Sequence, residues 1–174
     1  MNDDLNAYFN TVYDATFRTL MRVCLCKARR LADADDLLQN TYASFYRHIR
    51  RHGPASVENA QAYLLTLLRR ELAAYYRKWP WERETALDEI AELAATDEPP
   101  EAQSLERLTA EEIWTLLERE SELTQRVFVL YYGYEMRIKE IASALKLSES
   151  AVKNRLLRTQ KKLRSSLSKK EEAI

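Results

Sequence analysis

The chain has 174 residues, of which 46% are hydrophobic and 31% are charged, a composition that permits a packed core and argues against wholesale disorder. Basic and acidic residues both number 27, so the formal net charge is zero. Only two glycines and four prolines are present. Because a β-rich protein needs many glycine-type turns, the composition favours an all-α fold.

The zero net charge hides a division of charge along the chain. Residues 1–79 carry a net charge of +4, residues 80–123 carry −11 and residues 124–170 carry +9. Segregated charge of this kind indicates that the two basic ends bind a polyanion and that the acidic middle does not. Ordinary solvated helix faces are the alternative, and they fit scattered charges better.

Apolar spacing predicts three long helices in residues 1–79, which together make one helical bundle. We expect the first helix over about Asp3 to Leu31 and the second from an N-cap at Asp33. The break at His52–Ser56 ends the second helix, and the third runs from about Ser56 to Trp79, where Pro80 stops it. The third helix is predicted to turn inward Tyr63, Leu64, Leu67, Leu68, Leu72 and Tyr75.

No apolar run approaches the roughly 20 residues of a membrane span, and the acidic start of the chain lacks the order of a signal peptide. We therefore expect a cytoplasmic protein without membrane insertion. Cys24 and Cys26 point to different sides of a helix, which disfavours a local disulfide. They are interpreted as ordinary buried residues. The alternative is a zinc site shared with His48 and His52, but it lacks a convincing ligand spacing.

Residues 80–107 are predicted to form an acidic linker, with a helical turn or two around Leu87–Leu93. The sequence from Thr109 to Glu112 is a capping box and begins a helix that runs to about Glu120. Thr124 is expected to cap the next helix, which ends near Gly133. With two further helices, residues 108–170 make a second, four-helix domain after the first domain of residues 1–79.

A helix-turn-helix is the clearest motif of the chain and extends from Arg137 to about Leu167. Leu147 lies in the turn, and Ser148 is the N-cap of the second helix. Ala142 keeps the crossing of the two helices close. The inner faces are predicted from apolar spacing to comprise Ile138, Ile141, Ala142 and Leu145 in the first helix and Val152, Leu156 and Leu163 in the second. In such a unit the second helix lies in the DNA major groove.

The outward face of that second helix carries residue types that read base edges, because lysine and arginine suit guanine, asparagine suits adenine and an apolar group suits the thymine methyl. These residues are Glu149, Ser150, Lys153, Asn154, Leu157 and Arg158. Four more basic residues suit phosphates, which position a protein on DNA without specifying sequence: Arg155, Lys161, Lys162 and Arg164. The alternative is a solvated basic helix, but the cap, the turn residue and the inward pattern occur together.

Three segments resemble the extracytoplasmic-function (ECF) class of bacterial sigma factors, which has only regions two and four. The segment LTQRVFVLYYGYEMRIKEIASALKLSESAVKNRLLRTQKKLR resembles region four. Its family pattern is L-P-x-x-x-R-x-V-F-x-L-x-Y followed by Y-x-E-I-A-x-x-L-x-x-S-x-x-T-V-K-S-R-L-x-R-A-x-K-x-L-R. Two segments resemble region two: LADADDLLQNTYASFYRHI and AYLLTLLRRELAAYYRK. The family pattern for the first of them is A-E-D-L-V-Q-E-V-F-x-x-x-x-R.

The resemblance implies a transcription factor, not an enzyme, and no cofactor. Its partners would be core RNA polymerase (clamp helices and flap), promoter DNA and, as for many members of the class, an anti-sigma factor, and it would serve a stress- or signal-responsive regulon. The residues that match the clamp-binding surface are Asp36, Leu37, Gln39 and Asn40. Those that match the minus-10 reader are Gly53, Asn59, Tyr63, Arg69, Arg70 and Arg77. The minus-35 reader comprises Glu149, Ser150, Lys153, Asn154, Arg155, Leu157, Arg158 and Lys161.

The linker of residues 80–107 matches the family's connector through the polymerase channel, where its negative charge would mimic the transcript. A further hypothesis is that the linker shields the basic second domain in the free protein. The chain departs from the family pattern at four positions: Asn40 replaces Glu, Arg70 replaces Asn, Tyr63 replaces Trp and Pro54 follows the loop glycine. These departures concern clamp and minus-10 recognition.

Other functions are weaker alternatives. A conventional helix-turn-helix regulator would need a dimer interface or ligand pocket in the N-terminal half. A metal-carboxylate enzyme built on Asp33, Asp35 and Asp36 is disfavoured, because acids are expected at a helix start and no second acidic motif accompanies them. Trp79 and Trp81 are interpreted as capping the helical bundle, with strand separation as the alternative.

Overall fold

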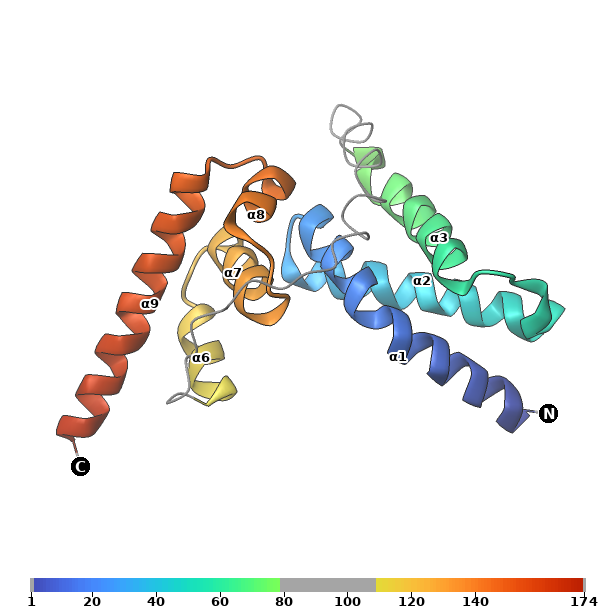
Figure 1. Cartoon of the computed structure of the whole chain (residues 1–174), viewed down its shortest axis with the longest axis horizontal. Coiled ribbons are helices and arrows are strands. Elements are labelled where there is room, and N and C mark those ends of the chain that lie inside the picture. The colour runs from blue at the N-terminus through green and yellow to red at the C-terminus, as the bar shows by residue number, and fades with distance from the viewer. Residues whose placement is uncertain (1, 79–108, 174) are drawn as a thin grey trace. The chain divides into compact units, whose positions relative to one another are not determined.

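The computed structural model describes residues 2–78 and 109–173, and these residues form helices and turns without a strand. The prediction of an all-α fold is confirmed. The chain divides into two units, unit 1 (Met1–Thr96) and unit 2 (Asp97–Ile174), which Figure 1 shows in a single colour gradient. The predicted linker of residues 80–107, with its helical turn and Trp81, lies outside the described residues, as does Trp79.

Unit 1 is built from three helices, α1 (Asn2–Lys27), α2 (Leu31–His52) and α3 (Ala60–Tyr75). Short 3-10 turns follow α2 at Pro54–Ser56 (η1) and α3 at Tyr76–Lys78 (η2). All three helices contribute fully buried side chains to one core, which include Leu20, Val23, Phe45, Ile49, Leu64, Leu68 and Leu72. Leu64, Leu67, Leu68 and Leu72, four of the residues that were predicted to turn inward from the third helix, are buried as predicted.

The helix limits of unit 1 differ from the prediction at the first connection. The first helix ends at Lys27, not Leu31, and α2 begins at Leu31 with Arg30 as its N-cap. Asp33 is therefore not the N-cap but lies in the first turn of α2. Its carboxylate forms an ion pair with Arg30 at 3.0 Å, a local contact that takes the place of a side-chain cap.

Two tyrosines at the end of α3 attach it to this first connection. The Tyr75 hydroxyl donates to Asp33 Oδ2 at 2.8 Å and accepts from the Arg29 amide at 3.0 Å. Burial, reinforced by the Asp33 carboxylate, raises the pKa of Tyr75 to about 12, so the hydroxyl keeps its proton. The Tyr76 hydroxyl donates to the Lys27 carbonyl oxygen. Tyr75, which was predicted to turn inward, is half-buried, and Tyr76, which was not among the predicted inward residues, is buried.

The third helix also begins later and ends earlier than predicted. Asn59 is its N-cap, with the side chain accepting the Ala62 amide at 3.0 Å. Gly53 has φ of +84°, a left-handed value that glycine adopts at little cost. The sharp turn at Gly53 and η1 separate α2 from α3, so the segment from Ser56 to Asn59 is a connection and not the first helical turn.

Unit 2 contains α6 (Ala110–Leu117), α7 (Glu122–Phe128), α8 (Ile138–Leu145) and α9 (Glu149–Glu172), with a π-helical turn η3 (Val129–Gly133) after α7. The capping box at Thr109 and Glu112 is confirmed. Thr124 is not the N-cap of α7, because Ser121 has that role and Thr124 is buried inside the helix. The core of unit 2 includes Leu117, Val127, Leu130, Met136, Ile141, Val152 and Leu163.

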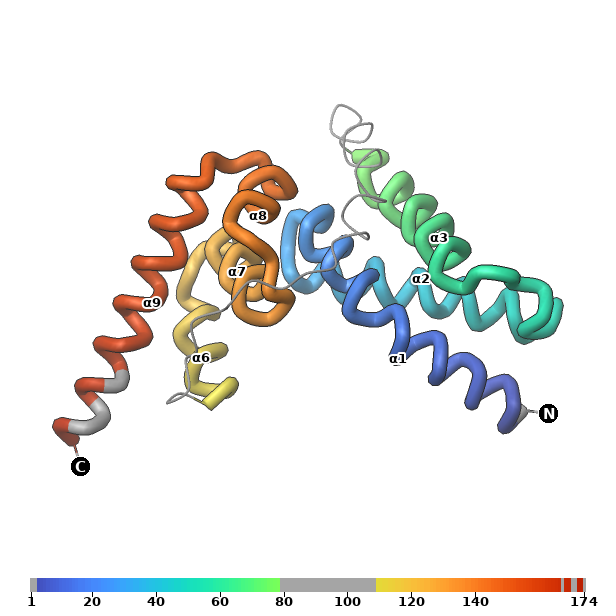
Figure 2. Tube along the Cα trace, viewed as in Figure 1, coloured from blue at the N-terminus to red at the C-terminus, as the bar shows by residue number. Residues whose placement is uncertain are grey.

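None of the helices within the described residues is long and apolar enough to cross a membrane. Figure 2 follows the backbone of both units and shows α9 as the longest element of unit 2.

Candidate nucleic-acid interface

The predicted helix-turn-helix is formed by α8, a short turn and α9. Lys146 adopts a left-handed conformation with φ of 55°, and the Leu147 amide donates to the Ala142 carbonyl at 2.8 Å. This closes α8 with a Schellman-type end. The Ser148 hydroxyl then accepts the Ala151 amide at 3.1 Å and begins α9, as the sequence predicted.

The contact between the two helices is apolar. Ile141 and Ala142 of α8 and Val152 and Leu156 of α9 are buried, and Ile138, Leu145 and Leu147 are half-buried. Ala142 is 5% exposed at this seam, which agrees with the prediction that a small residue is needed where the helices approach. The buried seam determines which face of α9 is left outward.

The outward face of α9 carries the residues predicted to read DNA. Seven of the eight predicted minus-35 residues are exposed: Glu149, Ser150, Lys153, Asn154, Leu157, Arg158 and Lys161. Leu157 is 61% exposed, the highest value among the large apolar residues identified as exposed. An apolar side chain held in water between basic neighbours suits contact with a thymine methyl group.

Arg155 stands apart from the other seven residues. It is half-buried, and its Nη1 donates to the Thr124 hydroxyl at 3.0 Å. Lys162, also predicted to meet phosphate, forms an ion pair with Glu120. The guanidinium and ammonium groups of these two residues are therefore directed toward other parts of unit 2.

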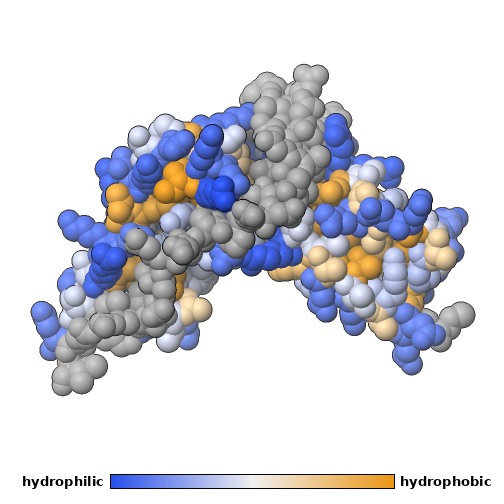
Figure 3. Space-filling view, viewed as in Figure 1, coloured by the Kyte–Doolittle hydropathy of each residue, from blue (hydrophilic) through white to orange (hydrophobic). Residues whose placement is uncertain are grey.

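A shallow hollow of about 260 Å³ adjoins the outward face of α9. Its lining includes Lys153 and Leu157 together with Tyr131, Ile138, Leu156 and Gln160. Figure 3 shows apolar surface between α8 and the N-terminal half of α9. Tyr131 and Gln160 were not among the predicted site residues, and the fold brings them beside Lys153 and Leu157.

The residues predicted to read the minus-10 element lie on α3 and on the connection before it. Arg69, Arg70 and Arg77 are exposed. Asn59 is exposed but its side-chain oxygen caps α3. Tyr63 is half-buried, with its ring centroid 4.8 Å from that of His48 and 6.2 Å from that of Phe45.

The end of α2 adds a basic surface that the site prediction did not include. Arg47, Arg50 and Arg51 are exposed there. The His48 and His52 rings lie 4.8 Å apart, and His48 is within 3.3 Å of the Ser56 hydroxyl. The run RHIRRH was visible in the sequence, and its charge density alone was a usable signal.

The residues predicted to bind polymerase occupy the first half of α2. Asp36, Gln39 and Asn40 are exposed on this helix. Leu37 is only 4% exposed, so its side chain packs in the core of unit 1. Its contact with polymerase stays a prediction.

The earlier metal alternatives gain no geometric support. Within the described ranges 2–78 and 109–173, no group of three metal-ligating side chains comes together. Cys24 and Cys26 are both buried in α1 and form no disulfide, and burial raises the pKa of the Cys24 thiol to about 12. A thiol of this kind is unreactive and packs as a small apolar group.

Two family models match the chain. Sigma-70 region 2 matches residues 12–82, and Sigma-70, region 4 matches residues 110–163. The two matches coincide with the bundle of unit 1 and the helix-turn-helix of unit 2, and together they cover most of the chain. The chain therefore belongs to the sigma-70 family.

Two known proteins are similar to the chain. A probable RNA polymerase sigma factor, RfaY of Xanthomonas campestris pv. campestris, is 28% identical over 163 residues, covering 91% of this chain and 40% of RfaY. The chain thus spans less than half the length of that relative. A co-crystal structure of the sigma factor RpoE with the anti-sigma factor NepR from Bartonella quintana aligns with a TM-score of 0.40 and 19% identity, over 95% of this chain and 97% of RpoE.

Proposed function

We propose that the protein is an ECF-type sigma factor that binds core RNA polymerase and directs it to promoters with a minus-35 and a minus-10 element. The observation that carries this proposal is the exposed row of readers on α9, held on a helix-turn-helix inside the region-four match. A stress- or signal-responsive regulon is part of the proposal, on the resemblance to the ECF class.

For the minus-35 element, we assign base reading to Lys153, Asn154, Leu157 and Arg158. Lys153 and Arg158 have donors for guanine, and Asn154 has the paired donor and acceptor that adenine requires. Glu149, Ser150 and Lys161 flank this group on the exposed face of α9. An α9 of 24 residues is roughly 36 Å long, so only its first half is needed for the major groove.

For the minus-10 element, we assign the exposed arginines of α3, Arg69, Arg70 and Arg77. The basic end of α2 adds charge for the phosphates of the same strand. Gly53, Asn59 and Tyr63 shape the connection between the two helices, where an unstacked base would be held. Asn59 and Tyr63 already have contacts within the fold, so we expect them to form the wall of such a site.

For polymerase, we assign the exposed polar face of α2, with Asp36, Gln39 and Asn40 contacting the clamp helices and unit 2 contacting the flap. The acidic segment 80–107 is proposed to follow the path of the transcript because of its charge: it has nine acidic and two basic residues, a net charge of −7. An anti-sigma factor is proposed from the resemblance to the ECF class.

The test is capture of purified core RNA polymerase by the tagged full-length chain. We expect stoichiometric binding by the wild type and a large loss with Asp36→Arg combined with Gln39→Arg. The matched control is Asp14→Arg, an exposed residue of α1 outside the assigned face, which should bind as the wild type does. Failure of the wild type to bind core polymerase would remove the proposed function, whereas equal binding by all variants would remove only the α2 assignment.

A further inference from the structure

Arg155 is the member of the predicted reading face that turns toward the interior of unit 2. Its Nη1 donates to Thr124 Oγ1 at 3.0 Å across the contact between α9 and α7. Its Nε is buried and, within the described residues, has no hydrogen-bond partner. A guanidinium that is partly removed from water and committed to a neighbouring helix is poorly placed to bind a phosphate, because it would first have to break the contact with Thr124.

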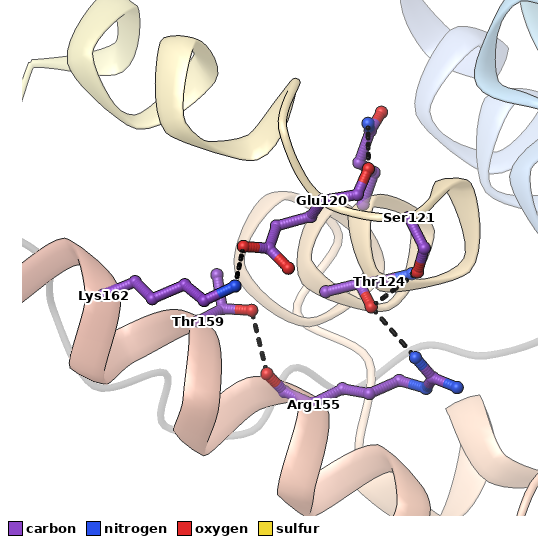
Figure 4. Close-up of polar contacts among 7 residues, drawn as sticks. Glu120, Ser121, Thr124, Arg155, Thr159 and Lys162 are labelled. Atoms are coloured by element: carbon purple, nitrogen blue, oxygen red, sulfur yellow. Dashed lines mark hydrogen bonds and ion pairs between the residues drawn. The ribbon is translucent and has the colours of Figure 1, made fainter.

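The contact with Thr124 continues into the first turn of α7. An arginine can only donate hydrogen bonds, so the Thr124 hydroxyl accepts, and its own proton is available to Ser121 Oγ, 2.9 Å away. Ser121 Oγ also accepts the Thr124 amide at 3.3 Å and caps α7. Figure 4 shows Arg155, Thr124 and Ser121 in one line of contacts between the two helices.

A second tether lies two helical turns further along α9. Lys162 forms an ion pair with Glu120 in the turn before α7, and the Glu120 carbonyl accepts from Gln125 Nε2 at 3.0 Å. Residues seven apart lie on the same side of a helix, so Arg155 and Lys162 hold one side of α9. Thr159, between them, is buried and donates to the Arg155 carbonyl at 2.9 Å.

The rotation of α9 about its own axis decides which side chains reach DNA. One residue corresponds to about 100° of rotation. The buried apolar residues Val152, Leu156 and Leu163 set that rotation through packing, and Arg155, beside Leu156, adds a directional hydrogen bond to α7. We propose that Arg155 is a positioning residue, which through Thr124 fixes the rotation of α9 so that Lys153, Leu157 and Arg158 face the bases. The inference rests on the proposed minus-35 function and replaces the predicted phosphate contact of Arg155.

Salt dependence separates the two roles of Arg155. A lost phosphate contact lowers the slope of log K against log salt by about 0.9. A lost positioning contact leaves that slope unchanged and reduces the preference for the correct sequence. The variants are Arg155→Met and Thr124→Val, singly and together, with Thr124→Ser as the conservative variant and Lys161→Met as the phosphate-type control. The probe is the tightest duplex that the wild-type chain selects from a randomised pool, with a scrambled duplex of the same composition as reference.

We expect Arg155→Met and Thr124→Val each to lower the ratio of selected to scrambled affinity about five-fold, the value of one ordinary hydrogen bond. The double variant should be no worse than either single variant, and Thr124→Ser should keep the wild-type ratio. Partial unfolding would weaken both duplexes equally and leave the ratio unchanged. The proposal is overturned if Arg155→Met lowers the salt slope as Lys161→Met does and keeps the ratio, or if Thr124→Val is silent.

A second measurement does not depend on DNA binding. Spin labels at exposed cysteines replacing Glu118 and Arg164 report the placement of α9 against the end of α6, while the buried native thiols stay unlabelled. We expect Arg155→Met and Thr124→Val to broaden or displace the distance distribution, and Thr124→Ser to preserve it. Unchanged distributions would refute the positioning role. If the wild-type chain selects no duplex, the minus-35 proposal fails, and this measurement still decides the role of Arg155.

Discussion

Replacing Lys153 and Arg158 together by alanine tests the reading face most severely. Both side chains are exposed on α9, so their removal should change the free energy of unfolding by no more than about 0.5 kcal/mol. A good contact between a basic side chain and a guanine contributes about 1–3 kcal/mol of discrimination, or roughly 5- to 150-fold. Loss of two such contacts predicts at least about a 25-fold decrease in specific transcription.

The assay is run-off transcription with core RNA polymerase on a cognate promoter, at saturating polymerase and limiting sigma factor. The control removes two exposed charges from elsewhere in unit 2, Lys139→Ala with Lys169→Ala, so that the net charge of the two proteins is equal. The control should stay within a few-fold of the wild type, the size expected when only general electrostatic attraction is reduced. Transcription by Lys153→Ala/Arg158→Ala equal to that of the control would refute the assignment of these residues as readers.

Four further predictions concern stability and charge. Ser148→Ala removes the cap of α9 and should lower the free energy of unfolding by about 1 kcal/mol in urea denaturation; a loss no larger than that of Ser150→Ala would contradict it. Tyr75→Phe should lower that free energy by about 1–3 kcal/mol, because it leaves Asp33 and the Arg29 amide without the hydroxyl. Burial opposes the Asp33 charge, but hydrogen bonds from Arg30 and Tyr75 and attraction to Arg30 outweigh burial and lower the pKa of Asp33. The stabilisation that the Asp33 carboxylate gives to the fold is therefore present above the unfolded pKa of about 3.9 and is lost as the pH falls through the folded pKa. The difference in free energy of unfolding between wild type and Asp33→Asn should therefore shrink in acid. A difference that stays constant with pH would contradict this prediction. Deleting residues 84–101, which removes acidic charge, should raise the low-salt DNA affinity of the free chain; unaltered affinity in a titration would end the shielding hypothesis.

The local signals of the sequence were sufficient where one helix determines its own structure. The Ser148 cap and the Thr109 capping box follow from residue type and spacing, and the structure has them as predicted. The same holds for the buried leucines of α3 and for Val152, Leu156 and Leu163 of α9. The helix-turn-helix was predictable for the same reason, because its cap, turn and seam are all local features.

Contacts between helices accounted for the errors. Asp33 has the residue type of an N-cap, but ion pairing with Arg30 and the hydroxyl of Tyr75, 42 positions away, place it inside α2. Thr124 also has the residue type of an N-cap, but Ser121 caps α7 by accepting the Thr124 amide. The Thr124 hydroxyl instead accepts a hydrogen bond from Arg155 of α9. Arg155 and Leu37 match a family motif by type, yet burial gives each a role that a motif does not reveal.

The central claim, promoter-directed initiation, is tested most directly by mapping the start sites that purified chain and core RNA polymerase produce together on the genomic DNA of the source organism. The account predicts a small set of start sites that core polymerase alone does not use, all preceded by one shared pair of minus-35 and minus-10 sequences. Start sites unchanged from those of core polymerase alone, or without a shared upstream sequence, would contradict it.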